Sequence, residues 1–498
     1  MLWIMSLVAV VAFVALVFDM GRVQVTHGEL QSFADSVALA AAGELDGNAN
    51  AIARATAAAA EVADTNVDGG DGTLQGAGDY TLTFLSGLPE PDEDDDAYNP
   101  ELASTAGYVA TTDAAARMVQ VDATPVSNTV GFLAATRALI GAAAGNTMST
   151  SAQAIAGFTM EACDITPLMF CLPNGSWEAK NNVGQQILLR SGGTVGAWGP
   201  GDFGFLDVSD GAVGSTCAGL KGANLVGCLL GAEGNVTQCY SQRGVTMEPG
   251  QKEGLNASVF NTRFDRFTST MNGEEDDARY TVAPNIVSGE VVNCTNDKVT
   301  VSTNSIGLPH DSNLNSCITS PSTCPRFGNK SWDYDTYFDT NHGDGNGTLF
   351  RDVDNPSLNE DAAFAALIPA DFAGTRYGVY LAEIAQAGGA TSLTNILTGR
   401  QETGRNSCSP NRSSDPKRRV VIAAGIDCTA NGIAGAAKNV PVKEFVELFM
   451  TNPIGAGEGT GNTKTFNIWV EVIGSLGKSG YGGAGSGGVF RDVVQLYR

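Results

Sequence analysis

The chain opens on an uncharged apolar stretch, residues 1–18, MLWIMSLVAVVAFVALVF, in which Ser6 is the one polar side chain. Folded as an α-helix, this stretch would rise about 27 Å, close to the ~30 Å hydrocarbon core of a bilayer. The length and composition of this stretch therefore predict a single transmembrane anchor over residues 1–18.

A cleaved signal peptide is the alternative interpretation of this stretch. It would need a basic segment before the apolar residues and small residues at a cleavage site just after them. The small-x-small pattern Ala38-Leu39-Ala40 lies well beyond the stretch, which is followed at once by Asp19 and Arg22. These features favour a retained anchor.

The residues after the anchor favour a continuous helix. Residues 21–64 contain no Pro and are dense in Ala, the strongest helix former. We therefore expect an Ala-rich helix over residues 19–64.

This helix carries an apolar stripe. Val23, Leu30 and Val37 are seven residues apart, and Phe33 and Ala40 fall between them at the alternate positions. The pattern is typical of a coiled-coil seam of about three heptads. The stripe can pack on the protein's own outer domain or against other anchored helices, and the sequence leaves both open.

The N-terminal residues resemble a known family. The apolar stretch ends in a D-x-G-R pattern and is followed by LQSFADSVALAAA at residues 30–42. The residues that carry the pattern are Asp19, Gly21, Arg22, Leu30, Gln31, Ala34, Asp35 and Leu39. Their order and spacing resemble the N-terminal module of the TadG-like proteins of the Tad (tight adherence, or Flp) pilus.

The resemblance implies a single-pass inner-membrane protein with most of its chain in the periplasm or at the cell surface. It also implies a non-catalytic role in pilus assembly, with other Tad or pilin-like proteins as partners. Some family members carry a von Willebrand A domain with a D-x-S-x-S metal motif. The segment Asp207-Val208-Ser209-Asp210-Gly211 lacks the second serine, so we expect no metal site of that type.

Composition excludes one class of partner. The 498 residues include 29 Lys and Arg against 54 Asp and Glu, for a net charge of −25, which would repel nucleic-acid phosphates. Gly is abundant, at 61 residues, and predicts a loop-rich protein. We expect no nucleic-acid partner.

The ten Cys all lie between residues 163 and 428. An even number confined to the outer part of the chain favours disulfides in an oxidising compartment. Zinc is disfavoured because the chain has no C-x-x-C motif and three His. The shortest spacings suggest pairing of Cys163 with Cys171 and of Cys317 with Cys324, and the other six stay open.

The expected fold class is α+β: an anchor helix, an Ala-rich helix and a large, loop-rich, disulfide-stabilised mixed α/β extracytoplasmic domain. The expected domains are 1–18 (anchor), 19–64 (Ala-rich helix), 65–150 (small mixed α/β region) and 151–498 (Cys-containing α+β domain). Periodicity predicts strands at 80–85, 118–123, 418–426 and 466–473, and helices at 128–144, 362–367, 376–387 and 441–450.

Enzyme signatures are lacking. The chain has no H-E-x-x-H or G-x-S-x-G, and Gly477-Lys478-Ser479 lacks the upstream glycine of a phosphate-binding loop. His310 and His342 are predicted to be surface residues in loops. We therefore expect no catalytic residues, no cofactor and no small-molecule substrate.

One string has calcium-loop spacing. Asp64, Asn66 and Asp68 precede Gly69 in a D-x-N-x-D-G pattern, but the twelfth position is Gln75 instead of the bidentate Glu. A turn at the end of the helix is favoured, since Asp and Asn suit turns, and calcium stays an alternative. The leading functional hypothesis is a membrane-anchored pilus-assembly scaffold, and the alternative is a surface adhesin or calcium-dependent binding module.

Overall fold

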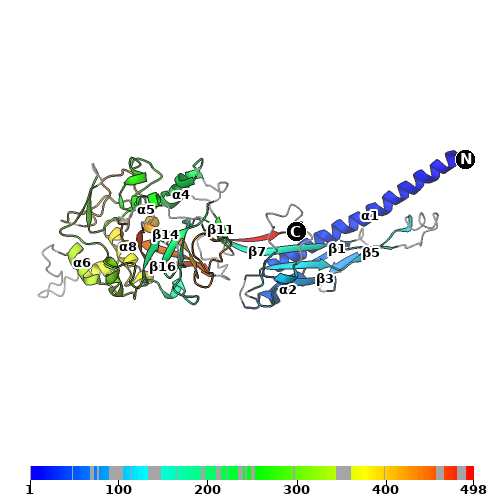
Figure 1. Cartoon of the computed structure of the whole chain (residues 1–498), viewed down its shortest axis with the longest axis horizontal. Helices are drawn as coiled ribbons and strands as arrows, with labels where there is room; N and C mark the ends of the chain where they lie inside the picture. Colours follow the sequence, from blue (N-terminus) through cyan, green and yellow to red (C-terminus); the bar gives the residue numbers. More distant parts are fainter. Residues whose placement is uncertain are drawn as a thin grey trace. The chain divides into compact units, whose positions relative to one another are not determined.

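The computed structural model forms two compact units (Figure 1). The N-terminal unit comprises Met1–Met160, Ser479–Gly482 and Asp492–Arg498, and the C-terminal unit comprises Glu161–Lys478 and Gly483–Arg491. The structure describes residues 2–46, 49–67, 72–75, 78–88, 105–113, 115–132, 147–163, 165–191, 197–208, 215–220, 222–233, 239–241, 244–247, 253–294, 298–343, 360–397, 399–455, 465–478 and 490–497.

The N-terminal unit combines two helices with an antiparallel sheet. Its elements are α1 (Leu2–Ala42), α2 (Ala51–Ala60), β1 (Ala63–Val67), β2 (Gly72–Gln75), β3 (Tyr80–Leu85), β4 (Met118–Ala123), β5 (Val126–Thr129), β6 (Thr147–Thr150), the first part of β7 (Gln153–Cys163) and most of β17 (Phe490–Leu496). Strand β4 pairs with β3 on one side and β7 on the other, and β17 also pairs with β7. The strands predicted at 80–85 and 118–123 are confirmed with the same bounds.

The second half of α1 packs on this sheet. Leu30, Phe33, Val37 and Ala41 recur at helical spacing and are at most 1% exposed. They lie against β4 and α2, and the Phe33 ring lies 6.2 Å from that of Tyr80. This part of the apolar stripe therefore packs on the protein's own unit, which was the first of the two alternatives.

The predicted continuous helix over 19–64 is wrong. Helix α1 ends at Ala42, and α2 begins only after Asn50, whose φ of 65° is left-handed. The Arg54 guanidinium closes the intervening turn through ion pairs to Glu44 (2.9 Å) and Asp46 (2.6 Å). A second helix can then fold back beside α1, which one straight Ala-rich rod could not do.

The helix predicted at 128–144 begins later than expected, since residues 128–130 are not helical and residues 131 and 132 are. Asn128 lies in β5, and its side-chain amide is buried between Thr26 of α1 and Thr150 of β6. Residues 133–146 lie outside the described residues.

The C-terminal unit is built on a closed six-stranded barrel with the strand order β10-β8-β14-β15-β16-β9. The strands are β8 (Leu168–Cys171), β9 (Gln186–Ser191), β10 (Asp202–Phe205), β14 (Val420–Ile426), β15 (Glu444–Met450) and β16 (Asn467–Lys478). β8 is parallel to β14 and β9 to β10, and the other neighbours are antiparallel. Two segments of the chain more than 200 residues apart thus close one barrel.

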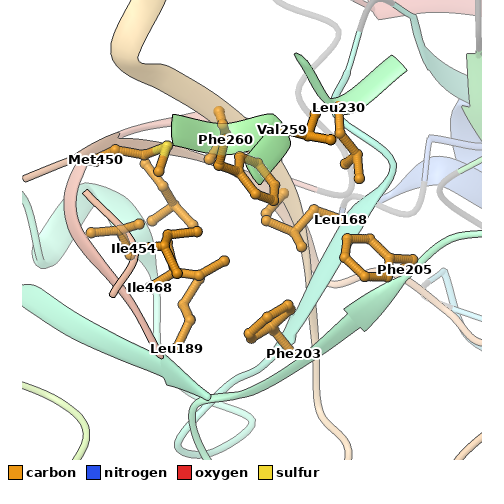
Figure 2. Close-up of a cluster of buried hydrophobic side chains, with 14 of the residues drawn as sticks. Leu168, Leu189, Phe203, Phe205, Leu230, Val259, Phe260, Met450, Ile454 and Ile468 are labelled. Atoms are coloured by element: carbon orange, nitrogen blue, oxygen red, sulfur yellow. The ribbon is translucent and has the colours of Figure 1, made fainter. Parts of the chain in front are cut away.

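Alternate residues of all six strands meet in one apolar cluster, which therefore fills the inside of the barrel (Figure 2). Leu168, Leu189, Phe203 and Ile468 belong to it. Val259 and Phe260 of α5 (Glu253–Asn261) and Leu230 of α4 (Gly222–Gly231) add to the cluster from the helices.

The helix predicted at 441–450 is wrong, since Glu444–Met450 form strand β15. Val446, Leu448 and Met450 belong to the inner cluster, whereas Phe449 packs outside, with ring centroids 5.2 Å from Tyr377 and 4.9 Å from Tyr380. Both faces of the strand are buried, so apolar residues occur on both faces and the sequence lacks the alternation that marks a strand.

The remaining elements surround the barrel. They are β11 (Cys239–Ser241), β12 (Glu290–Asn293), β13 (Lys298–Val301), α6 (Tyr334–His342), α7 (Glu360–Ala365) and α8 (Arg376–Gln386). The helix predicted at 376–387 corresponds to α8, and that predicted at 362–367 begins two residues earlier, as α7. Strands β14 and β16 correspond to the runs predicted at 418–426 and 466–473.

Four disulfides lie in the described part of the C-terminal unit: Cys171–Cys428, Cys217–Cys228, Cys294–Cys408 and Cys317–Cys324. The predicted pairing of Cys163 with Cys171 is wrong, because Cys171 ends β8 directly opposite Ile426 of β14, which brings Cys428 within reach. The backbone of Cys163 lies opposite Cys239 in the register of β7 and β11. Cys317 and Cys324 pair as their spacing suggested.

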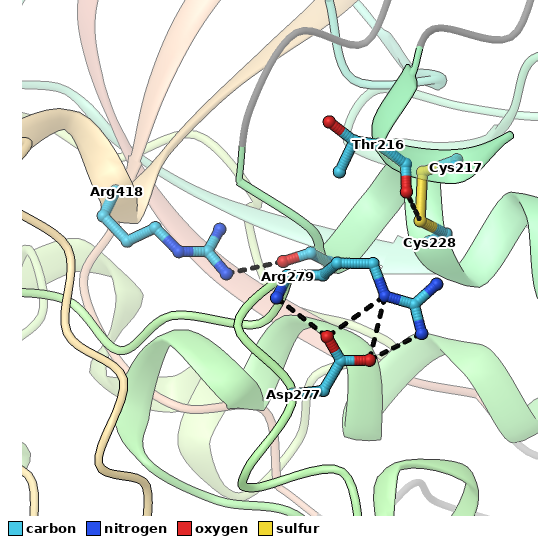
Figure 3. Close-up of a disulfide and its surroundings, with 7 residues drawn as sticks. Thr216, Cys217, Cys228, Asp277, Arg279 and Arg418 are labelled. Atoms are coloured by element: carbon cyan, nitrogen blue, oxygen red, sulfur yellow. Dashed lines mark hydrogen bonds and ion pairs between the residues drawn. A yellow bond between two sulfur atoms is a disulfide. The ribbon is translucent and has the colours of Figure 1, made fainter.

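Helix α4 is fixed near its C-terminus (Figure 3). Cys228 ties it to Cys217 in the preceding turn. At its C-terminus, the buried guanidinium groups of Arg263 and Arg418 donate to the carbonyls of Leu230 (2.6 Å) and Gly231 (2.5 Å). Cations at a helix C-terminus also interact favourably with the helix dipole.

Candidate interaction surface

The first half of α1 exposes apolar side chains. Trp3, Val10, Phe13, Val14 and Val17 are between 56% and 89% exposed. Their spacing of three, four and seven residues places them on one side of the helix, which we call the apolar face. A contiguous exposed apolar surface of this kind marks a site for a protein or lipid partner.

The apolar face gives way to buried contacts between residues 18 and 26. The Phe18 ring meets that of Phe132 edge-on at 6.0 Å, and Asp19 is 3% exposed. One turn and a half later, the buried Thr26 hydroxyl donates to Asn128 Oδ1 at 3.0 Å. Phe18 itself is 59% exposed, so the N-terminal unit holds this stretch of the helix through the buried side chains of Asp19 and Thr26.

The residues of the family pattern also fall into a buried group and an exposed group. Leu30 and Ala34 are fully buried against the sheet. Gln31 Nε2 donates to the Gln153 carbonyl (2.9 Å) and to Asp35 Oδ1 (2.8 Å), which pins α1 to β7. Leu39 is half-buried. This part of the pattern positions the helix.

Gly21 and Arg22 of the pattern are exposed. A Cβ built on Gly21 would meet no atom within 4 Å, so nothing inside the described structure requires glycine there. Glycine in a helix interior costs roughly 0.5–1 kcal/mol relative to alanine.

The string with calcium-loop spacing lies largely outside the described residues. Asp64 lies in β1, and the side chains of Asp64, Asn66 and Asp68 lie outside the described residues. Among the residues that the structure describes, no three His, Cys, Asp or Glu side chains are grouped to hold a metal ion. Asp207 follows β10, and Asp210 is not described. Gly477 and Lys478 belong to strand β16.

The prediction of surface histidines is wrong. His342 ends α6 with its side chain 6% exposed, and its Nε2 lies 2.9 Å from Glu383 Oε1 of α8. His310 stacks on Trp469 with ring centroids 3.8 Å apart. Burial, with help from the nearby Arg376, lowers the pKa of His310 to about 4. Each histidine is covered by an element distant in sequence, which local composition could not reveal.

Sequence reasoning also missed a buried charge network. Arg376 is fully buried and donates to Asp311 Oδ1 (2.7 Å), Glu471 Oε1 (3.1 Å) and the Pro309 carbonyl (2.7 Å). The Glu471 carboxylate also accepts the backbone N–H groups of Arg376 and Tyr377, the first two residues of α8. Burial raises the pKa of Glu471 and the Arg376 guanidinium opposes that shift. The charged residues of this network lie up to 160 residues apart in the sequence, so no local motif indicates them.

In the part of the chain that the structure describes, no helix has both the length and the hydropathy needed to cross a bilayer.

Residues 1–44 match the family model described as putative Flp pilus-assembly TadE/G-like. No curated protein and no solved structure matches the chain. The matched residues coincide with α1, including its apolar face and the pattern that pins it to the sheet. The match indicates a part in Flp pilus assembly, in the cell envelope, together with other components of that pilus system.

Proposed function

Because residues 1–44 are a TadE/G-like segment, we propose that this protein is a membrane-anchored, non-catalytic scaffold of Flp pilus assembly. The observation that carries the proposal is the division of α1. The second half of α1 packs within the N-terminal unit, whereas the first half exposes the apolar face. Such a helix attaches a folded unit to something apolar outside it.

Lipid is the proposed environment of the first half. Residues 1–18 carry no charge, and large side chains among them, such as Trp3, Phe13 and Val17, are exposed in the isolated chain. Exposed Val and Phe side chains gain free energy on leaving water, at about 25 cal/mol per Å² of apolar surface. The bulk of the chain, with its disulfides, would then lie in the periplasm or at the cell surface.

Scaffolding, with no chemistry, is the proposed mode of action. Its support is that the buried charges of the C-terminal unit are engaged in holding the fold. The Arg376 guanidinium donates to two carboxylates and a carbonyl. The Arg419 guanidinium donates to the carbonyls of Met450, Thr451 and Asn285. Partners among the pilus components would dock on the apolar face or on the exposed residues around Gly21.

The test replaces Val14 and Val17 together by Asp in the full chain, expressed in cells that lack the native copy. An Asp costs roughly 2.5–3.5 kcal/mol at the centre of an inserted helix and less toward its ends. With two charges in one turn of the helix, we expect the double variant to leave the membrane fraction and to fail to restore pili. Both positions are exposed, so the melting temperature of the purified protein should not change.

Gln24→Asp is the matched control, since Gln24 is an exposed residue of α1 beyond the apolar stretch. This control should fractionate and restore pili like the unmodified chain. Membrane retention and normal piliation by the Val14/Val17 double variant would overturn the proposal.

A further inference from the structure

The C-terminal unit contains a cavity of about 710 Å³ beside the buried charge network. Its walls come from the loop at 306–315, the start of α6 and two single residues, Ser288 and Asn452. The volume lies within the ~300–1,000 Å³ typical of small-molecule sites. It is far from α1 in sequence and is not used by the proposed scaffold function.

The wall formed by Pro309 and His310 is held rigidly from behind. Arg376 binds the Pro309 carbonyl, and Gln186 Oε1 accepts the Asp311 backbone N–H (3.0 Å) and His310 Nδ1–H (3.2 Å). Asp311 Oδ2 in turn accepts the Lys330 backbone N–H at 2.8 Å. A site whose walls are fixed in this way loses little entropy on binding.

An aromatic ring on the cavity wall is also fixed. Trp332 donates from its indole Nε1 to the Gly374 carbonyl at 3.0 Å, and the Arg376 guanidinium lies 4.9 Å from its ring centroid. The side chain is half-buried, so part of it faces the cavity. A fixed indole provides an apolar surface for the C–H groups of a ligand.

The polar groups around the ring can both donate and accept. The Asn315 side chain is exposed, so its amide oxygen and N–H₂ group can both contact a ligand. Asn452 Oδ1 is taken by the Thr451 hydroxyl at 2.8 Å, which leaves its amide N–H₂ as a donor. His310 is neutral because its pKa is about 4, and with Nδ1–H given to Gln186 its Nε2 is an acceptor.

The charge of the cavity disfavours an anionic ligand. Among the described residues that line it, Asp333 is ionised at neutral pH and none is Lys or Arg. The backbone N–H of Thr336, and then its hydroxyl, lower the pKa of Asp333. Each Asp333 carboxylate oxygen accepts one of these two groups, at 3.0 and 2.7 Å, and keeps a second lone pair for a ligand hydroxyl. With the net charge of −25, the carboxylate would repel an anion.

We propose that this cavity binds a neutral pyranose sugar, through Trp332 against the ring C–H groups and Asn315, Asn452 and Asp333 on its hydroxyls. Sugar hydroxyls are donors and acceptors at once, which matches the mixed set of groups, and an apolar ligand would leave these groups unpaired. The protein would hold the sugar without transforming it, as an adhesive contact to a glycan would require.

The test titrates the full chain in detergent with D-galactose and with N-acetyl-D-glucosamine, followed by tryptophan fluorescence and calorimetry. We expect saturable one-site binding of at least one sugar. Asn315→Ala should raise its Kd about fivefold to tenfold, the loss expected for one or two hydrogen bonds, without lowering the melting temperature. Trp332→Phe should weaken binding while keeping a ring against Arg376.

Asn313→Ala is the matched control, because Asn313 lies two residues away in the same turn but does not line the cavity. It should bind like the unmodified protein. Absence of saturable binding by both sugars, or equal binding by the Asn315 and Asn313 variants, would overturn the proposal. Tighter binding of a quaternary ammonium such as choline than of either sugar would also overturn it, in favour of a cation site. Piliation of the Asn315 variant should be normal, so this result is independent of the scaffold proposal.

Discussion

At the scale of single residues, the C-terminal unit is specified by buried arginines. Arg419 is 1% exposed and lies 4.5 Å from the ring centroid of Phe264, 4.7 Å from that of Phe449 and 5.1 Å from that of Tyr380. Arg376 bridges Asp311 and Glu471 in the same unit. Each guanidinium ties together segments that are distant in sequence, at the cost of removing a charge from water.

Removing Arg376 should be strongly destabilising. Arg376→Ala would leave the Asp311 and Glu471 carboxylates buried and unpaired, and we expect the free energy of unfolding to fall by about 3–5 kcal/mol. Urea denaturation of the full chain measures the change. Lys180→Ala is the control, since Lys180 forms a surface ion pair with Glu178 and is 63% exposed, and it should cost less than about 1 kcal/mol. Equal losses for the two variants would contradict the account.

His310 should make stability depend on pH. Its folded pKa of about 4 lies below the ordinary value of 6.5, so the unfolded chain binds more protons between these values and stability falls as pH is lowered through that window. Between pH 7 and pH 4 the cost is about 3 kcal/mol, at 1.36 kcal/mol per pKa unit. Buried carboxylates with raised pKa values, such as Glu471 and Glu402, act in the opposite direction.

The contribution of His310 to this pH dependence is therefore measured as the difference between the unmodified chain and a variant that lacks the imidazole. Denaturation of the unmodified chain and of His310→Gln at both pH values should show that the variant loses about 3 kcal/mol less on acidification. Parallel pH profiles for the two proteins would show that His310 is not held neutral by burial.

At the scale of elements, α1 has two halves with different surroundings. The same residue type occurs in each, since Phe33 is 1% exposed on the sheet and Phe13 is 68% exposed on the apolar face. Helix propensity alone cannot distinguish the halves, because packing of one face supplies most of a helix's stability in a protein.

The two phenylalanines form a matched test of that division. Phe33→Ala should lower the free energy of unfolding of the N-terminal unit by about 3–5 kcal/mol, through lost burial and a cavity. Phe13→Ala should change it by no more than about 0.5 kcal/mol, as expected for an exposed position. Thermal denaturation in detergent followed by circular dichroism compares them, and a similar loss in both variants would disprove the division.

Glycine positions provide a second test at this scale. Gly28 lies in α1 with no atom within 4 Å of an added Cβ, so Gly28→Ala should stabilise the helix by about 0.5–1 kcal/mol and slow its amide exchange a few-fold. Gly201 has a φ of +79°, and a Cβ there would lie 2.9 Å from Arg326 Cβ and 3.1 Å from the Leu188 carbonyl oxygen. Gly201→Ala should therefore destabilise the C-terminal unit, and the same sign for both substitutions would be inconsistent with these conformations.

At the scale of the whole molecule, the sequence predicted local elements better than their assembly. Strands β3, β4 and β14 and helix α8 could be predicted because their patterns are local: each has a period that one half-buried surface imposes, or a bounded apolar run. Strand β15 could not, because both of its faces are buried in the barrel. The apolar face of α1 follows from residues 1–18, whereas its fixation by Gln31 and Thr26 depends on β7 and β5.

The sites of the C-terminal unit could not be predicted for a topological reason. Closing the barrel brings residues 168–205 beside residues 420–478, and with them Cys171 beside Cys428. Helix α8 packs on β16 and brings Arg376 to Glu471. These neighbours depend on strand order, which no local pattern contains. The cavity beside Trp332 arises from the same long-range contacts.

The most direct measurement concerns the exposed half of α1. A photo-crosslinking residue placed at position 14 of the full chain, in cells that express the rest of the pilus system, reports what touches the apolar face. The account predicts crosslinks from position 14 to lipid or to another pilus component, and none to either from position 37, where Val37 is fully buried in the N-terminal unit. Equal yields from the two positions, or recovery of the full-length chain free of the membrane fraction with no crosslink at position 14, would contradict it.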